Sequence, residues 1–240
     1  MKYASLVALA AAMGAGLYYY NHVNDEIRRR VLEMLAAHYV DLHVEVRSAL
    51  LVDGEGIEIR GITISDPELS GPSAELAYFD EIVLTCRTEL KEFLAGQPTI
   101  ERVRVRRPRI RATRLSGGRW TAARLLPCPK FGKHRVETVI ENGVLEVIDA
   151  TRPDSPTFTL REINLDLHPL IAEHADGDEP VRFKGSLGGD YFQRVTIAGR
   201  MEANGAGFHL EEGSIDRLDI SPEFHHALPS ELAEPFSAIA

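Results

Sequence analysis

The sequence predicts a mainly β protein: an N-terminal transmembrane helix followed by a long run of mostly antiparallel strands with short helices. Residues 4–20 carry no charged side chain, and as a helix rising ~1.5 Å per residue they approach the thickness of a bilayer core. After residue 38, apolar residues recur at every second position in short segments, which is the period of a β-strand. With 240 residues, of which 44% are hydrophobic, the chain can bury a sizeable core.

The N-terminal apolar segment is interpreted as part of an uncleaved membrane anchor, residues 1–23. A signal peptide is an alternative, because Lys2 precedes the segment and the small residues at 14–16 resemble a cleavage site. Against cleavage, residues 17–20 extend the segment and end it with three tyrosines, which suit the membrane interface. A buried helix of a soluble protein is the third alternative.

The charges beside this segment leave its orientation open. Lys2 favours a cytoplasmic N-terminus, whereas Arg28–Arg30 on the other side favour a cytoplasmic C-terminal body. Asp25 and Glu26 change little, because the rule counts Lys and Arg rather than net charge. Charge counting therefore does not decide on which side of the membrane the body lies.

Composition and motifs disfavour several function classes. The net charge is −9, which argues against nucleic-acid binding because affinity for phosphates comes from clustered cations. The sequence has no G-x-S-x-G, P-loop or G-x-G-x-x-G motif, and its nine histidines are scattered. Only two cysteines are present, Cys86 and Cys128, which excludes a disulfide-rich scaffold. We therefore expect no enzymatic activity, no cofactor and no metal site.

Hydrophobic periodicity places the elements along the chain. Residues 24–38 are predicted to be helical, with Asn24 as the N-cap. Strands follow at 40–47, 57–64, 76–86, 103–112, 136–140, 145–147, 158–167, 181–183, 195–201, 208–210 and 215–220. The alternation slips at Arg60–Gly61, which indicates a β-bulge. Gly117–Gly118 and Asn142–Gly143 predict hairpin turns.

A weak internal repeat suggests two β units. The segment 59–64 (IRGITI) matches 160–165 (LREINL), and each has a phase slip after its arginine. The stretch 127–133, rich in proline and glycine, is the candidate linker between them. The predicted units are 24–126, with its leading amphipathic helix, and 127–240, which we expect to be incomplete at its C-terminus.

Arginines form the strongest charge pattern. Arg102, Arg104 and Arg106 alternate with valines, so their guanidinium groups should share one face of a sheet. One interpretation is the solvated face of an antiparallel sheet. The other is a surface for anionic lipid head groups or an acidic partner, since the planar guanidinium can donate two hydrogen bonds to a phosphate.

These residues, taken in order, resemble the AsmA-like family of repeating β-groove, bridge-like lipid carriers. The first segments that carry the resemblance are the membrane segment, the basic helix 28–37, the strand 40–47 and GIEIRGITI at 56–64. They are followed by a strand–helix–strand passage at 77–103, with a short helix near 89–95. The later segments are PRIR at 108–111, GRW at 118–120, VIENGVL at 139–145 and LREINLDL at 160–167. The resemblance implies a curved, taco-like sheet with an apolar concave groove, anchored in the inner membrane with its body in the periplasm. It implies membrane lipids as partners and a role in carrying phospholipids for envelope lipid homeostasis.

Under this resemblance, apolar residues on the first four strands are the candidate groove. They are Leu42, Val44, Ile57, Ile59, Ile82, Leu84, Val103 and Val105. Family members are usually much longer than this chain, so one such unit would have difficulty spanning a periplasm.

A non-carrier role is the second hypothesis, and an envelope enzyme is a third with less support. Residues 215–220 read as a strand near the C-terminus with little sequence after it to cover its far edge. An uncovered strand edge invites pairing. We therefore expect one of two arrangements. Either this chain is part of a longer groove, or its last strand pairs with an envelope protein or with a second copy of the chain. Pairing with an envelope protein is what we expect of a structural or assembly factor.

Overall fold

The computed structural model describes residues 22–52, 56–86, 100–129, 136–152, 157–170, 180–202 and 207–228. The predicted membrane segment at 4–20 and the short helix predicted near 89–95 lie outside these ranges. In the part of the chain that is described, no helix is both long and apolar enough to cross a membrane.

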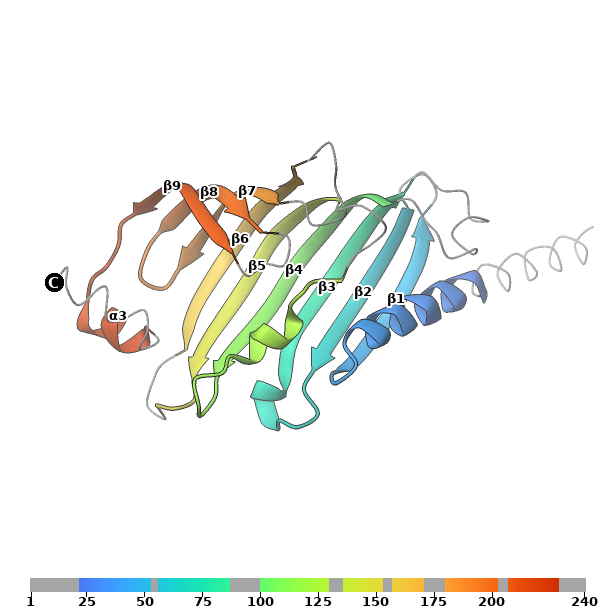
Figure 1. The fold of residues 1–240 in the computed structure, drawn as a ribbon, viewed down its shortest axis with the longest axis horizontal. Coiled ribbons are helices and arrows are strands. Elements are labelled where there is room, and N and C mark those ends of the chain that lie inside the picture. Colours follow the sequence, from blue (N-terminus) through green and yellow to red (C-terminus); the bar gives the residue numbers. More distant parts are fainter. Residues whose placement is uncertain are drawn as a thin grey trace, which may run out of the picture.

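A single nine-stranded sheet forms the body of the protein, with its strands in chain order from β1 to β9 (Figure 1). The strands are β1 His43–Val52, β2 Gly56–Ser65, β3 Glu75–Cys86, β4 Ile100–Arg114, β5 Glu137–Asp149, β6 Phe158–Pro169, β7 Val181–Gly189, β8 Arg194–Met201 and β9 Phe208–Asp216. Short helices are η1 Gly71–Ala74, η2 Thr121–Leu125 and α3 Pro222–Ala227, and residues 22–38 are helical. The prediction of a mainly β fold is confirmed.

Neighbouring strands are antiparallel except β4 and β5, which are parallel and place Val105 beside Ile140. The connection between these two strands contains η2 and the boundary at 126/127 predicted from the internal repeat. Four antiparallel strands thus precede the junction and five follow it, and all nine belong to one continuous sheet.

A row of backbone irregularities crosses the sheet from β1 to β6. In each of these strands two consecutive residues lie on the polar face, so the apolar positions advance by three residues instead of two. The apolar positions that flank the row are Val46 and Ala49, Ile59 and Ile62, Phe79 and Ile82, Val105 and Pro108, Ile140 and Gly143, and Leu160 and Ile163. Positive φ angles occur in this row at Gly61 (64°), Arg107 (47°), Asn142 (55°) and Glu162 (50°). The phase slips predicted in β2 and β6 are therefore confirmed.

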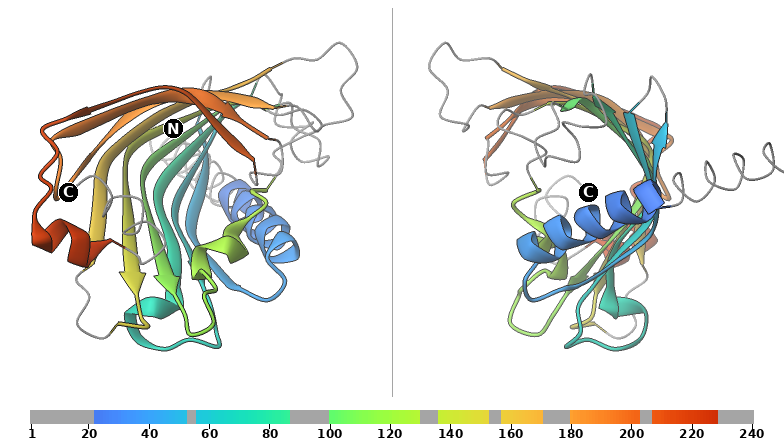
Figure 2. Two further views of the ribbon diagram at one scale, coloured as in Figure 1. Left: turned by 60° about the vertical axis from the view of Figure 1, so that its left-hand side comes forward. Right: turned by 90° about the vertical axis from the view of Figure 1, so that its right-hand side faces the viewer.

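This row explains the curvature of the sheet. A bulge adds a residue to one side of a strand and bends it locally. Because the added residues of six adjacent strands all lie on the polar face, they lengthen that face relative to the apolar one. The sheet accordingly curls around its apolar face into an arch (Figure 2).

The helix over residues 22–38 lies on the concave face, against β1 and β2 (Figure 1). Ile27, Val31 and Leu35 recur every four residues, so they share the helix face that is buried. Asn24 is not the N-cap that the sequence predicts, because the chain is already helical at residue 22. Its side-chain Oδ1 instead accepts a hydrogen bond from the backbone N–H of Leu51, at 3.3 Å.

Two predicted elements differ from the structure. Asn142–Gly143 lies inside β5 as a bulge rather than at a hairpin turn. The sequence does not distinguish the two, because both a bulge and a hairpin turn accept the positive φ of Asn142. The strand predicted at 215–220 is the end of β9, which stops at Asp216 before Arg217 adopts a φ of 52°. The chain then enters α3, whose N-cap Ser221 accepts a hydrogen bond from the Phe224 N–H.

Candidate apolar binding surface

The eight residues predicted to line a lipid groove lie on or beside one face of the sheet. Directly opposite residues of neighbouring strands share a face. The rows are Ile57–Leu84–Val103 and Ile59–Ile82–Val105, with Val44 further along on β1 and Leu42 just before that strand. Seven of the eight are buried, with at most 9% of their surface exposed, and Leu42 is partly buried against them.

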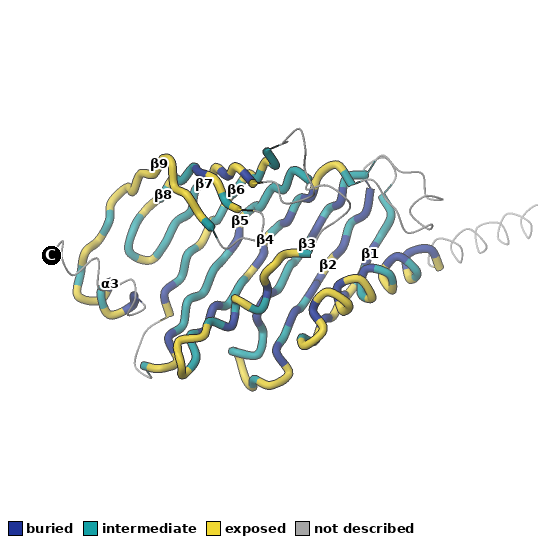
Figure 3. The backbone as a smooth tube through the Cα atoms, viewed as in Figure 1, coloured by how far each residue is buried: buried dark blue, intermediate teal, exposed yellow. Residues whose placement is uncertain are grey.

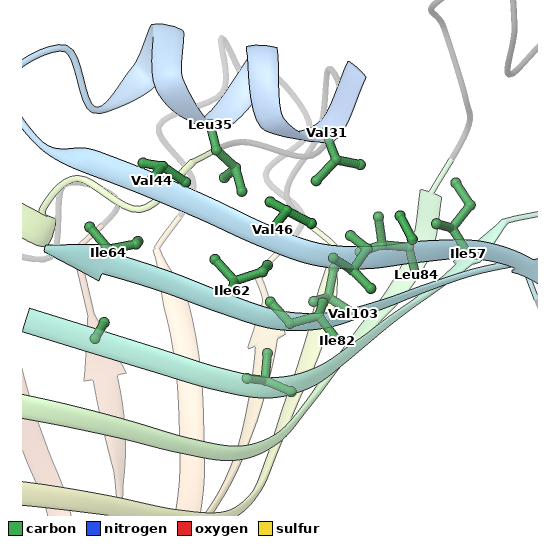
Figure 4. Close-up of a cluster of buried hydrophobic side chains, with 14 of the residues drawn as sticks. Val31, Leu35, Val44, Val46, Ile57, Ile62, Ile64, Ile82, Leu84 and Val103 are labelled. Atoms are coloured by element: carbon green, nitrogen blue, oxygen red, sulfur yellow. The ribbon is translucent and has the colours of Figure 1, made fainter. Parts of the chain in front are cut away.

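These side chains face the helix over residues 22–38 rather than an open groove. They belong to one hydrophobic cluster together with the helix residues Val23, Ile27, Val31 and Leu35. Figure 4 shows Val31 and Leu35 pointing from the helix toward the strands, where Val44 and Val46 lie. The helix therefore occupies the positions where lipid contacts were expected, and the open part of the apolar face lies elsewhere.

The connection between β4 and β5 completes this cover. Leu125 of η2 is buried in the same cluster, and its carbonyl accepts a hydrogen bond from the Tyr39 hydroxyl at 3.3 Å. Burial raises the pKa of Tyr39 well above its ordinary value of 10.0, so the hydroxyl stays protonated and remains a donor. Arg124 forms an ion pair with Asp66 and donates to the Asp41 carbonyl, which fixes the same connection beside the end of the helix.

The apolar face continues beyond the helix onto the later strands. From Val105, one row runs through Ile140, Leu165, Gly185, Ile197 and Gly213. At its far end, Phe208, Leu210 and Ile215 of β9 are 62%, 50% and 52% exposed (Figure 3). We define the open apolar face by its large side chains that are partly buried or exposed, which are Ile163, Leu165, Leu167, Leu187, Val195, Ile197, Phe208, Leu210 and Ile215. Phe183 lies among them but is buried, with 3% of its surface exposed.

Glycines let the strands of the open apolar face approach closely. A Cβ on Gly199 would lie 2.7 Å from the Phe183 ring, and one on Gly185 would lie 2.5 Å from Cδ2 of Leu165. The Phe183 ring stacks on Phe208, with the two centroids 4.7 Å apart. A methyl group at either glycine would force these side chains apart, so the glycines permit the close packing seen here.

One end of the open apolar face is closed by α3. Phe224 of this helix contacts Tyr191, with ring centroids 5.4 Å apart, and Tyr191 stacks on Phe158 at 6.1 Å. Phe158 lies opposite Val147 on the apolar face, so the cluster covers the ends of β5 and β6. On this face of the sheet, the exposed large apolar side chains in the described part of the chain are Phe208, Leu210 and Ile215 of β9.

The sequence analysis missed the open apolar face as a candidate site. The signal was present in the alternation Val195-Ile197-Met201 and in Phe208-Leu210. These residues were assigned to strands, but nothing local distinguished a covered apolar face from an uncovered one.

The arginines of β4 lie on the opposite, polar face beside carboxylates of the flanking strands. The N–O distances are 2.9 Å for Arg102–Glu137, 3.4 Å for Arg104–Glu141, 2.6 Å for Arg106–Glu81 and 3.1 Å for Arg106–Glu141. A lipid phosphate would have to compete with these carboxylates. The arrangement therefore favours the interpretation of this ladder as a solvated face held together by cross-strand ion pairs.

An open depression of about 550 Å³ lies over β5 to β9. Its lining includes the acidic residues Glu141, Asp166 and Glu212 and the basic residues Lys184 and Arg194. Both signs of charge are present, so the depression offers no clear preference for an anion or a cation.

The ion pair between Arg107 and Asp80 predicts a loss of stability in acid. The hydrogen bond from the Arg107 guanidinium holds the pKa of Asp80 below its ordinary value of 3.8. A carboxyl with a lowered folded-state pKa adds stability that is fully present above the unfolded pKa and is lost as pH falls through the folded pKa. We expect urea denaturation between about pH 5 and about pH 2 to show this loss.

Asp80→Asn should weaken the dependence of the unfolding free energy on pH over that interval. Asp166→Asn is the matched control, because Asp166 lies on the same face and has no ion-pair partner among the described residues. Equal acid dependence in both variants would contradict a role for the Arg107–Asp80 pair.

Comparison with known proteins adds no relative: no family model matches the chain, and no curated protein matches it.

Proposed function

We propose that this protein binds the acyl chains of phospholipids along the open apolar face, as an AsmA-like protein of the inner membrane with a single membrane-spanning segment and its body in the periplasm. In that role it would hold or conduct phospholipids for envelope lipid homeostasis. The observation that carries the proposal is the concave apolar surface of β6 to β9, part of which is exposed.

The composition of this surface supports hydrocarbon as the ligand. The strand pairing shows which residues of β6 to β9 lie on this face. From the bulge in β6 to the far end of that strand, and on the paired parts of β7 to β9, each of these residues is apolar or glycine. The positions are Ile163, Leu165, Leu167, Pro169, Val181, Phe183, Gly185, Leu187, Val195, Ile197, Gly199, Met201, Phe208, Leu210, Gly213 and Ile215. With no polar side chain among them, the bound part of a ligand needs no hydrogen bonds, and its head group must stay at the rim.

The energetics favour an occupant over an empty surface. Continuous exposed apolar surface is uncommon on monomeric proteins and marks a binding site, since burial is worth ~25 cal/mol per Å². A flexible acyl chain can follow a curved face and gains ~0.8 kcal/mol per buried CH₂. The predicted membrane segment at 4–20 supports a lipid source, because it directly precedes the helix that packs on β1.

A photo-crosslinking amino acid tests this proposal on the full chain in membranes that contain radiolabelled phospholipid. Placed at Phe208, which lies on the open apolar face, it should give a protein–phospholipid adduct. Placed at His209, the next residue on the same strand but on the polar face, it should give little or none. Placed at Ile59, beneath the helix, it should also give none.

The contrast between adjacent positions makes the test specific. Equal adducts at Phe208 and His209 would mean that the reagent samples bulk membrane rather than a bound lipid. No adduct at Phe208, or an adduct to protein only, would overturn lipid binding at this surface.

A further inference from the structure

The two outer edges of the sheet differ. On β1, the side chains of the helix satisfy backbone groups: Asn24 accepts from the Leu51 N–H, and Arg28 donates to the Val46 carbonyl, both at 3.3 Å. Side chains that occupy the hydrogen-bonding groups of an edge strand block pairing with another chain. The β1 edge is therefore protected.

The β9 edge has no comparable protection in the described part of the chain. β9 is paired with β8 and with no other described strand, and all nine of its residues are exposed. An extended strand with a free edge presents unpaired N–H and C=O groups at a regular spacing, which is the template for β-augmentation.

Charge indicates what kind of strand fits there. Several carboxylates of the sheet pair with guanidinium groups on a neighbouring strand, as in Arg106–Glu81 and Arg200–Glu211, both at 2.6 Å. Two further carboxylates of β9, Glu212 and Asp216, have no ion-pair partner among the described residues. A tenth strand that continued the pattern would carry Lys or Arg on the polar face and apolar residues on the other.

We infer that the β9 edge accepts an extended strand of another protein, with apolar residues on one face and basic residues on the other. A second copy is disfavoured, because overlapping two β9 strands would bring their Glu211–Glu212 pairs together and the β1 edge is protected. The chain's own residues 229–240 are also a poor match, since they contain two glutamates and no Lys or Arg. This inference does not rest on lipid binding.

Binding of synthetic strands to the full chain tests it. The probe is a fluorescent peptide of nine residues in which Val and Arg alternate. Its binding to the protein is measured by fluorescence anisotropy. The same peptide with every backbone amide N-methylated keeps its charge but has no backbone N–H to donate to the β9 edge, and it should bind at least ~10-fold more weakly. The counterpart with Val and Glu should not bind.

Charge reversal on the protein supplies the second comparison. Glu212→Arg/Asp216→Arg should weaken binding of the Val/Arg peptide at least ~10-fold and allow the Val/Glu peptide to bind. Glu45→Arg/Glu68→Arg makes the same change in net charge at two exposed positions outside β9. Its affinity for the Val/Arg peptide should stay within ~2-fold of that of the unchanged protein.

Two results would overturn the inference. If the N-methylated peptide binds as well as the parent, the attraction is general charge rather than strand pairing. If the chain without peptide is a stable dimer whose β9 amides resist hydrogen exchange, a second copy occupies the edge. Lipid adducts at Phe208 are measured in a separate experiment. Absence of strand binding at the β9 edge would therefore leave the proposed lipid binding unaffected, and absence of lipid adducts would leave the strand-binding inference unaffected.

Discussion

Leu84→Asp is expected to unfold the half of the sheet that lies beneath the helix. Leu84 is 3% exposed, and register places it between Ile57 and Val103 in the cluster that the helix covers. An unpaired carboxylate in such a site costs several kcal/mol, a large part of the ~5–15 kcal/mol that stabilises a typical domain. Circular dichroism and urea denaturation would show loss of structure or a greatly lowered midpoint.

Two further variants complete this experiment. Leu84→Ala should cost about 2–5 kcal/mol, because it leaves a cavity without a buried charge. Ile215→Asp makes the same chemical change on the same face of the sheet, at a residue that is 52% exposed, and should change stability by less than ~1 kcal/mol. If Leu84→Asp were as stable as Ile215→Asp, the covered and open halves of the apolar face would not differ.

Strand positions could be predicted because burial of one face imposes period two. The slip at Arg60–Gly61 was also predictable, since glycine adopts positive φ at no steric cost. Asn142–Gly143 was assigned wrongly for the same reason: a hairpin turn and a bulge both need positive φ, and only the partner strands distinguish them. That the slips align across six strands and curl the sheet is a property of register, which no single segment contains.

The candidate site was harder to predict than the fold. The apolar face was recognised, but which half the helix covers depends on how residues 22–38 pack in three dimensions. Composition offers a partial clue in retrospect. The covered strand β2 carries the large, branched Ile57 and Ile59, which fill a core, whereas the open strands carry Gly185 and Gly213 in the same row as Ile197. A glycine has no side chain to bury, so strands that carry glycines in this row contribute less to a packed core than β2 does.

The double variant Leu210→Asp/Ile215→Asp is expected to abolish lipid adducts from a crosslinker at Phe208 while leaving the fold intact. Both residues are at least half exposed, so the new carboxylates keep their hydration when the surface is empty. When an acyl chain binds, they must be desolvated against hydrocarbon or the chain must withdraw from β9. Losing contact with two CH₂ groups at ~0.8 kcal/mol each lowers affinity more than ~10-fold.

The control for this variant lies on the same strand. His209→Asp/Ser214→Asp also adds two carboxylates to β9, but register places both residues on the polar face. It should therefore keep the adducts at Phe208 to within about twofold, since exposed charges on the far side of the sheet are screened by solvent. If both double variants lost the adducts equally, added negative charge would repel phospholipid in general. If neither lost them, the crosslinked lipid would not be lying on β9, and acyl-chain binding along the open apolar face would have to be abandoned.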